Sequence, residues 1–179
     1  GYHANMGILP AVSDAQTLIL ADKLVHASII DGIKLSGLQF SRFRHNDYGH
    51  LDSLAKKATA DGKKLIIIAE SVYSMDGDCA DIDALAEVKR RYPGSLLYID
   101  EAHAVGVEGP AGLGLCKAST AFDDVDIMIG TLGKALASSG AFAILSSELK
   151  SFMVNRARSL VFSTAIPPIS ALWSRFTFL

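Results

Sequence analysis

The sequence contains few cysteines, and neither lies in a pattern typical of a disulfide framework or a metal site. Cys79 and Cys116 are the two cysteines among 179 residues, and no CxxC motif or Cys/His cluster surrounds either one. Disulfide-rich secreted domains and structural zinc sites both depend on such patterns. We therefore expect two ordinary thiols and no bound metal ion.

An excess of charge of one sign and long hydrophobic runs are also lacking. The 17 basic and 19 acidic residues give a formal net charge of −2, which leaves no global basic field to hold a nucleic acid or a membrane surface. Apolar runs such as Leu65–Ala69 are far shorter than the roughly 20 residues that cross a bilayer. The first residues do not have the pattern of a signal peptide. We expect a cytoplasmic protein that binds small molecules and protein chains, with no nucleic-acid or membrane partner.

What remains is the composition of a folded globular chain, with 50% hydrophobic and 20% charged residues. No internal repeat, linker or low-complexity tract interrupts it, so we expect one domain over residues 1–179. The chain begins with Gly1 instead of methionine and stops in the apolar stretch Phe176–Leu179. We expect it to be a piece of a longer protein.

Short apolar, β-branched runs alternate with helical patterns of about a dozen residues, which predicts a three-layer α/β domain with a mostly parallel sheet. The expected strands are Thr17–Ala21, Gln39–Arg44, Lys64–Ala69, Leu96–Ile99, Asp126–Gly130, Ala141–Leu145 and Ser159–Ser163. The expected helices, with apolar residues at spacings of three and four, are Ala27–Ser36, His50–Ala60, Asp83–Arg91 and Glu148–Arg156. In such sheets the chemistry gathers in the loops that follow the strands.

One of these loops, Asp100-Glu101-Ala102-His103, matches the acidic element of a helicase-type ATPase when taken alone, with Gly133-Lys134 as the end of a phosphate loop. A phosphate loop needs Gly, four residues, Gly, Lys and then Ser or Thr. Here the first position is Met128 and the last is Ala135. The acidic element also precedes the Gly-Lys pair, which is the reverse of the order in such ATPases. We therefore reject an ATPase.

Lys134 and Asp100 instead suit a single cofactor. Lys134 follows a strand among small residues, where partial desolvation lowers the pKa of the amine and favours imine formation with an aldehyde. Pyridoxal phosphate (PLP) supplies that aldehyde, and a carboxylate at the end of another strand, such as Asp100, keeps the ring nitrogen protonated. His103 is placed to reach the ring hydroxyl, and His26 is a candidate for the ring face.

The phosphate of this cofactor needs backbone amides at the start of a helix together with hydroxyl donors. Gly1-Tyr2 and Thr131 are the residues that fit this requirement.

Seven motifs in a fixed order carry a family resemblance. They are Gly1-Tyr2 with Asn5, His26-Ala27-Ser28, His45-Asn46-Asp47, Glu70 with Ser74-Met75-Asp76-Gly77-Asp78, Asp100-Glu101-Ala102-His103, Gly130-Thr131-Leu132-Gly133-Lys134, and Ser163-Thr164. Over essentially all 179 residues, the chain resembles the large domain of the α-oxoamine synthases. These are PLP-dependent transferases of fold type I, with a three-layer α/β/α large domain, that condense an amino acid with an acyl-CoA and release carbon dioxide.

The resemblance implies a role for each matching residue. Lys134 would form the imine and serve as the main general acid and base. The cofactor would be held by Asp100 on the ring nitrogen, His103 and Ser74 near the ring oxygen, His26 on the ring face, and Gly1, Tyr2 and Thr131 on the phosphate. Thr164 would reach the phosphate of the neighbouring subunit, because the active sites of this family lie at the interface of a homodimer.

The resemblance also implies substrates: an amino acid and an acyl-CoA or acyl-carrier-protein thioester. Arg42 and Arg44 with His45-Asn46-Asp47 are most similar to the 8-amino-7-oxononanoate synthases, which use a pimeloyl thioester and L-alanine in biotin synthesis. Glycine C-acetyltransferase, serine palmitoyltransferase and 5-aminolevulinate synthase share most of the other motifs and stay open, as does a non-catalytic subunit of this fold. We expect the family's N-terminal arm and small C-terminal domain to be missing, and this piece alone to be inactive.

Four features have structural interpretations as well. His45-Asn46-Asp47 can act in the site or cap the helix that begins near His50. Glu70 can be a structural carboxylate that orients the loop ahead of Ser74. Asp76-Gly77-Asp78 is most simply a turn, and Lys89-Arg90-Arg91 suits the end of a helix better than a CoA phosphate site.

Overall fold

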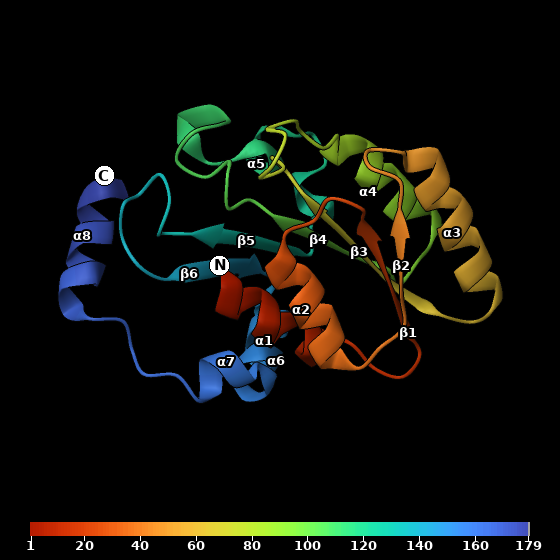
Figure 1. Ribbon diagram of the computed structural model, residues 1–179, viewed down its shortest axis with the longest axis horizontal. Coiled ribbons are helices and arrows are strands. Elements are labelled where there is room, and N and C mark those ends of the chain that lie inside the picture. Colours follow the sequence, from red (N-terminus) through yellow and green to blue (C-terminus); the bar gives the residue numbers. More distant parts are fainter. Residues whose placement is uncertain (179) are drawn as a thin grey trace.

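A six-stranded sheet with the order β2-β1-β3-β4-β5-β6 forms the centre of the structure, a computed structural model that describes residues 1–178 (Figure 1). The strands are β1 (Thr17–Asp22), β2 (Phe40–Phe43), β3 (Lys64–Glu70), β4 (Leu96–Asp100), β5 (Ile127–Thr131) and β6 (Ala141–Leu145). Neighbouring strands from β2 through β5 pair in parallel, and β6 pairs antiparallel with β5. The predicted mostly parallel sheet is confirmed.

Helices cover both faces of the sheet (Figure 1). On one face lie α1 (Tyr2–Val12), α2 (Ala27–Ser36), α6 (Ser147–Arg156) and α7 (Arg158–Val161). On the other face lie α3 (Tyr48–Ala60), α4 (Ile82–Arg91) and the short α5 (Leu115–Ala118). Two 3₁₀ turns, η1 (Pro110–Gly112) and η2 (Phe122–Asp124), belong to the connections, and α8 (Pro168–Phe178) ends the described chain. The predicted three-layer arrangement is therefore confirmed.

The consecutive apolar residues of β3 follow from this burial on both faces. Leu65, Ile67 and Ala69 pack with α3 and α4, whereas Ile66 and Ile68 pack with α1 and α2. Successive side chains of a strand point to opposite faces, so a strand covered on both sides needs apolar residues at every position.

Sequence-predicted helix boundaries agree with the structure within two residues, because polar side chains cap the helices. Asp47 accepts a hydrogen bond from the backbone N–H of His50, and Asp81 accepts one from Ala84, at the starts of α3 and α4. Helix α2 is followed by Gly37, whose φ of 69° favours glycine.

The predicted strand Ser159–Ser163 is wrong, because helix α7 occupies residues Arg158–Val161. The backbone N–H groups of Leu160 and Val161 donate to the carbonyl oxygen of Ala157, which begins a helical turn. The Ser159 hydroxyl donates to the backbone carbonyl of His3 at 2.6 Å, so this segment packs across α1 and does not join the sheet.

Helix α1 lies very close to α2, and Gly32 is the residue that permits this. A Cβ atom at Gly32 would lie 2.6 Å from the carbonyl oxygen of Asn5. The helix start predicted near Gly1 is confirmed as the start of α1, which includes Pro10 in its last turns.

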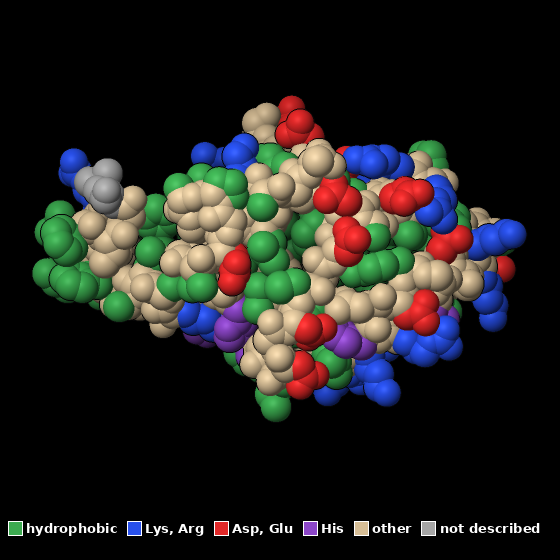
Figure 2. Space-filling view, turned by 90° about the horizontal axis from the view of Figure 1, so that it is seen from above, with side chains coloured by type: hydrophobic (Ala, Val, Ile, Leu, Met, Phe, Trp, Pro, Cys, Tyr) green, Lys and Arg blue, Asp and Glu red, His purple; other side chains and the backbone are tan. Residues whose placement is uncertain are grey.

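Helix α8 lies at one end of the molecule (Figure 1), and exposed apolar side chains gather at this end (Figure 2). Ile169, Leu172 and Phe176 are each more than 60% exposed. None of the helices in residues 1–178 has the length and apolar character needed to cross a membrane. Within the same residues, no group of three or more His, Cys, Asp or Glu side chains is arranged to hold a metal ion.

Candidate active site

Polar residues meet at one edge of the sheet, where the parallel strands end. Glu70 ends β3, Asp100 ends β4 and Thr131 ends β5, and Glu70 is the register partner of Asp100. Each follows by two positions a residue that packs against α1 and α2: Ile68, Tyr98 and Ile129. Because side chains alternate along a strand, all three polar side chains lie on the same face as those helices.

A small cavity of about 100 Å³ opens at this edge. It is lined by Gly1, Tyr2, Asn5, His26, Ser28, Glu70, Asp100, Ala102, Thr131 and Lys134. The structure therefore brings most of the sequence-predicted site residues together, including the lysine and the aspartate. His103 joins them through Lys134. Ser74 and the exposed Thr164 do not line this cavity.

Lys134 extends from the loop after β5 towards His103, and its Nζ atom lies 2.5 Å from the Nε2 atom of that histidine. Burial lowers the pKa of Lys134, although the charges of Asp100 and Glu70 act in the opposite direction. Burial and the nearby lysine lower the pKa of His103 as well. An amine with a lowered pKa is neutral, and hence nucleophilic, at lower pH than an ordinary lysine.

Asp100 is almost fully buried and held on both of its oxygen atoms. The side-chain amide of Asn5 donates to Oδ2 at 2.8 Å, and the backbone N–H of Ala102 donates to Oδ1 at 2.9 Å. These contacts fix the plane of the carboxylate at the cavity wall.

The first turn of α1 forms another part of the cavity wall. Gly1 caps this helix, and its nitrogen donates to the Thr131 hydroxyl at 3.4 Å. The first N–H groups of a helix have no acceptor within the helix and carry its positive dipole end. With the Lys134 amine nearby, this region suits an anion such as a phosphate.

Glu70, expected as a structural carboxylate ahead of Ser74, also lines the cavity. It is 2% exposed and accepts a hydrogen bond from the backbone N–H of His26. Burial, with the neighbouring charge of Asp100, raises the pKa of Glu70 to about 7. Its position at the end of a strand was the available signal, because Glu70 and Asp100 end adjacent strands.

Glu101, the neighbour of Asp100, does not line the cavity. It is fully buried on the other face of the sheet, where its carboxylate accepts hydrogen bonds from the backbone N–H groups of Leu115 at 3.0 Å and Cys116 at 2.6 Å. Glu101 therefore caps α5.

Comparison with known proteins identifies the family of this chain. Residues 1–177 match the family described as "Aminotransferase class I and II". The chain belongs to this family.

Within the aminotransferase class I and II family, two similar proteins carry the name of an α-oxoamine synthase. "Putative 8-amino-7-oxononanoate synthase" of Glaesserella parasuis serovar 5 (strain SH0165) is 54% identical over 178 residues, which cover 99% of this chain and 47% of that protein. The corresponding Pasteurella multocida (strain Pm70) protein, named in the same way, is 52% identical, with 99% and 46% covered. The chain thus spans about half the length of the relatives it matches.

Solved structures of the same group superimpose closely on this chain. A serine palmitoyltransferase from S. paucimobilis with a bound PLP–myriocin aldimine has a TM-score of 0.92 at 27% identity, with 99% of this chain and 45% of that one covered. The 8-amino-7-oxononanoate synthase of Francisella tularensis has a TM-score of 0.83 at 31% identity, with 99% and 50% covered. The predicted fold class and family resemblance are confirmed.

Outside the cavity, this aminotransferase domain holds His45 in a cluster of its own. The Nδ1 atom of His45 lies 2.9 Å from Asp22, and Nε2 lies 2.7 Å from Asp78. Asp47, and not His45, caps α3. His45 thus joins the end of β1 to the loop that carries Ser74.

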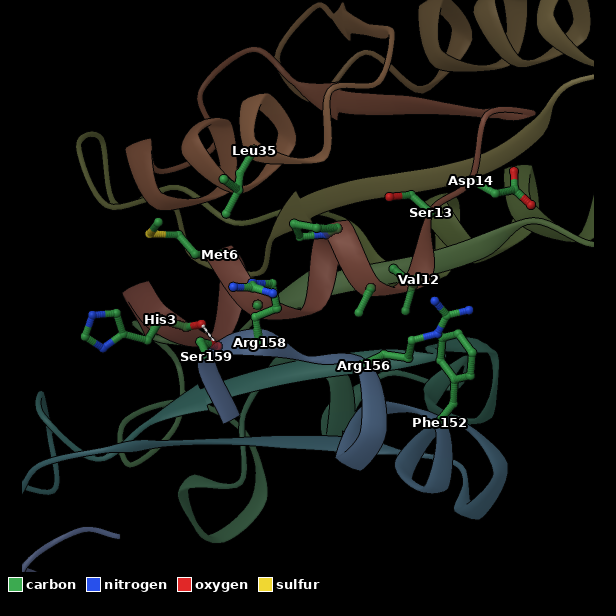
Figure 3. Close-up of a pocket in the computed structure, with 13 residues that line it drawn as sticks. His3, Met6, Val12, Ser13, Asp14, Leu35, Phe152, Arg156, Arg158 and Ser159 are labelled. Carbon is green, nitrogen blue, oxygen red and sulfur yellow. Dashed lines mark hydrogen bonds between the residues drawn. The ribbon is translucent and has the colours of Figure 1, made fainter. Parts of the chain in front are cut away.

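A larger groove of about 540 Å³ lies between α1 and the segment formed by α6 and α7 (Figure 3). Its lining includes Met6, Val12, Leu35, Phe152 and Arg156. It is away from the carboxyl ends of the strands and contains none of the residues predicted for the cofactor, so the smaller cavity is the candidate active site.

Proposed function

We propose that this chain is the PLP-binding large domain of an enzyme that condenses an amino acid with an acyl thioester and releases carbon dioxide. The observation that carries the proposal is the presence of Lys134 and Asp100 in the wall of one cavity. They come from the ends of different strands and can therefore hold opposite ends of one ring.

The residues of the cavity fit PLP. A partly desolvated amine, a buried carboxylate and a helix start beside a hydroxyl match its aldehyde, ring nitrogen and phosphate. When bound, PLP supplies an aldehyde that reacts with amines and a ring that withdraws electrons from the attached substrate.

The protein's own side chains orient the reactants and move protons. Lys134 would hold the proton that leaves and returns at the substrate α carbon, and its lowered pKa favours the neutral amine that accepts it. His103, in contact with Nζ, orients this amine. The further roles that we propose for cofactor binding are those of Asp100 on the ring nitrogen, His103 and Ser74 near the ring oxygen, His26 on the ring face, Gly1, Tyr2 and Thr131 on the phosphate, and Thr164 on the partner subunit's phosphate.

Among the possible members, we propose an 8-amino-7-oxononanoate synthase that uses a pimeloyl thioester and L-alanine. The identity of 54% with a relative of that name supports this choice over serine palmitoyltransferase, because the S. paucimobilis enzyme is 27% identical. Presence of Lys134 favours a catalytic protein over a non-catalytic subunit.

We further propose a cytoplasmic homodimer. The exposed apolar side chains of Leu160, Phe162 and Ile166, which flank Thr164, support a partner chain in this region.

The decisive experiment uses the full-length protein incubated with PLP and then with borohydride, followed by peptide mass spectrometry. We expect a covalent pyridoxyl group on Lys134, its loss in Lys134→Ala and its retention in Lys150→Ala, which alters an exposed lysine. Equal labelling of Lys134→Ala would overturn the assignment. Thiol release with pimeloyl-CoA and L-alanine, compared with palmitoyl-CoA and L-serine, tests the substrates.

A further inference from the structure

Asn5, in α1, connects three side chains that come from other parts of the fold. Its Nδ2 atom donates to Asp100 Oδ2 at 2.8 Å and to Ser28 Oγ at 2.9 Å. Its Oδ1 atom accepts from the hydroxyl of Tyr98. Asn5 itself is fully buried, so these contacts are not in competition with bulk water.

The chemistry of the partners fixes which way the Asn5 amide points. A carboxylate accepts hydrogen bonds and cannot donate them, so the NH₂ group must face Asp100. Burial, followed by the charge of Asp100, raises the pKa of Tyr98 well above its ordinary value, so the phenol stays protonated and donates to the amide oxygen. A reversed amide would place oxygen against oxygen at Asp100 and leave the phenol facing an NH₂ group.

Ser28 links Asn5 to His26, because its hydroxyl contacts both side chains. Because the Ser28 oxygen accepts from Asn5, its hydroxyl hydrogen is free to point to His26 Nδ1, which is 2.8 Å away. The backbone N–H of Ser28 also donates to Nδ1, at 3.2 Å. A backbone N–H can only donate, so Nδ1 must present a lone pair to it. The Ser28 hydroxyl then also donates to Nδ1, and the proton of the neutral ring lies on Nε2.

We propose that Asn5 is a positioning residue, which orients the Asp100 carboxylate and, through Ser28, holds His26 as the tautomer protonated at Nε2. The value of this arrangement for PLP rests on the proposed function. Asp100 and His26 both line the cavity. The Asn5 amide would therefore orient the Asp100 carboxylate that accepts from the ring nitrogen. It would also keep the Nε2–H of His26 available as a donor at the ring face.

The first test is ¹⁵N NMR of the histidine side chains in the full-length protein without cofactor, with the His26 signals assigned from their loss in His26→Gln. We expect an unprotonated Nδ1 and a protonated Nε2. In Ser28→Ala and in Asn5→Ala, the Nδ1 signal should shift towards the protonated form, because one donor is lost or the Ser28 oxygen becomes free to accept. Ser28→Thr, which keeps the hydroxyl, should resemble the parent protein.

Two results would overturn the inference. One is a parent protein protonated at Nδ1. The other is an unchanged His26 spectrum in both Ser28→Ala and Asn5→Ala when circular dichroism shows both to be folded; if Asn5→Ala does not fold, Ser28→Ala against Ser28→Thr decides alone.

Titration with PLP separates this inference from the proposed function. Asn5→Ala should bind PLP roughly tenfold more weakly or worse, as expected for the loss of a hydrogen bond to a charged group. If the parent protein does not bind PLP, the proposed function fails, whereas the NMR spectra still decide the tautomer.

Discussion

Glu70 and Asp100 are register partners at the ends of adjacent parallel strands, and both are almost completely removed from water. Burial and the charge of Asp100 raise the pKa of Glu70 to about 7. The cavity thus contains a carboxyl group that exchanges its proton near neutral pH, next to one that is fixed by hydrogen bonds from Asn5 and Ala102.

Glu70 should make the cofactor-free protein less stable as the pH rises. A carboxyl group whose pKa is raised on folding contributes stability that is present below its unfolded value of 4.5 and is lost as the pH rises through about 7. The loss corresponds to roughly 3 kcal/mol at most. Urea unfolding should therefore show that Glu70→Gln gains stability relative to the parent protein as the pH rises from about 4 to about 8, a range that brackets the unfolded and folded pKa values. A constant difference across this range would contradict the prediction.

Removing the charge of Asp100 should lower the pKa of Lys134 further, because that charge now opposes the effect of burial. We expect the reaction of Lys134 with an amine-directed reagent, followed by peptide mass spectrometry without PLP, to begin at lower pH in Asp100→Asn. Asp123→Asn, which alters an exposed carboxylate, should leave the profile unchanged. A shift to higher pH in Asp100→Asn would contradict the electrostatic explanation.

Glu101 should matter for stability, although it adjoins Asp100. In Glu101→Gln, an NH₂ group must face one of the two buried backbone N–H donors of α5. We expect a loss of about 1–3 kcal/mol in the free energy of unfolding, with PLP binding retained. Glu108→Gln, at an exposed position, is the matched control. Full stability of Glu101→Gln would show that these bonds are dispensable.

His45 should stabilise the fold mainly at acidic pH. Burial lowers its pKa, but hydrogen bonds and charges from Asp22 and Asp78 outweigh this, and the net shift is upward. Its contribution is fully present below the unfolded pKa, about 6.5, and is lost as the pH rises through the raised folded value. Urea unfolding should show that His45→Gln costs less stability at alkaline than at acidic pH. A larger cost at alkaline pH would contradict the prediction.

Most strands, and the placement of Lys134 and Asp100 at one cavity, were predictable because both depend on local pattern. The apolar run that forms β3 was located to within one residue, and Lys134 and Asp100 were identifiable because parallel strands end at one edge. The segment Ser159–Ser163 was not predictable in this way. Its apolar residues favour a strand locally, yet its position over α1 places it outside the sheet.

Contacts between residues that are far apart in the sequence could not be predicted from local sequence pattern. His45 meets Asp22 and Asp78 only because β1 and β3 are adjacent in the sheet. The different roles of Asp100 and Glu101 follow from their opposite directions at the strand end, a consequence of alternation that becomes useful once it is known which helices cover each face.

Gly32 has no functional group, yet the backbone of Asn5 rests directly on it. A single added methyl group there would push on the carbonyl of the residue that aligns Asp100. The tolerance of the candidate site to mutation is thus set partly by a glycine on a neighbouring helix, where sequence variation would otherwise look harmless.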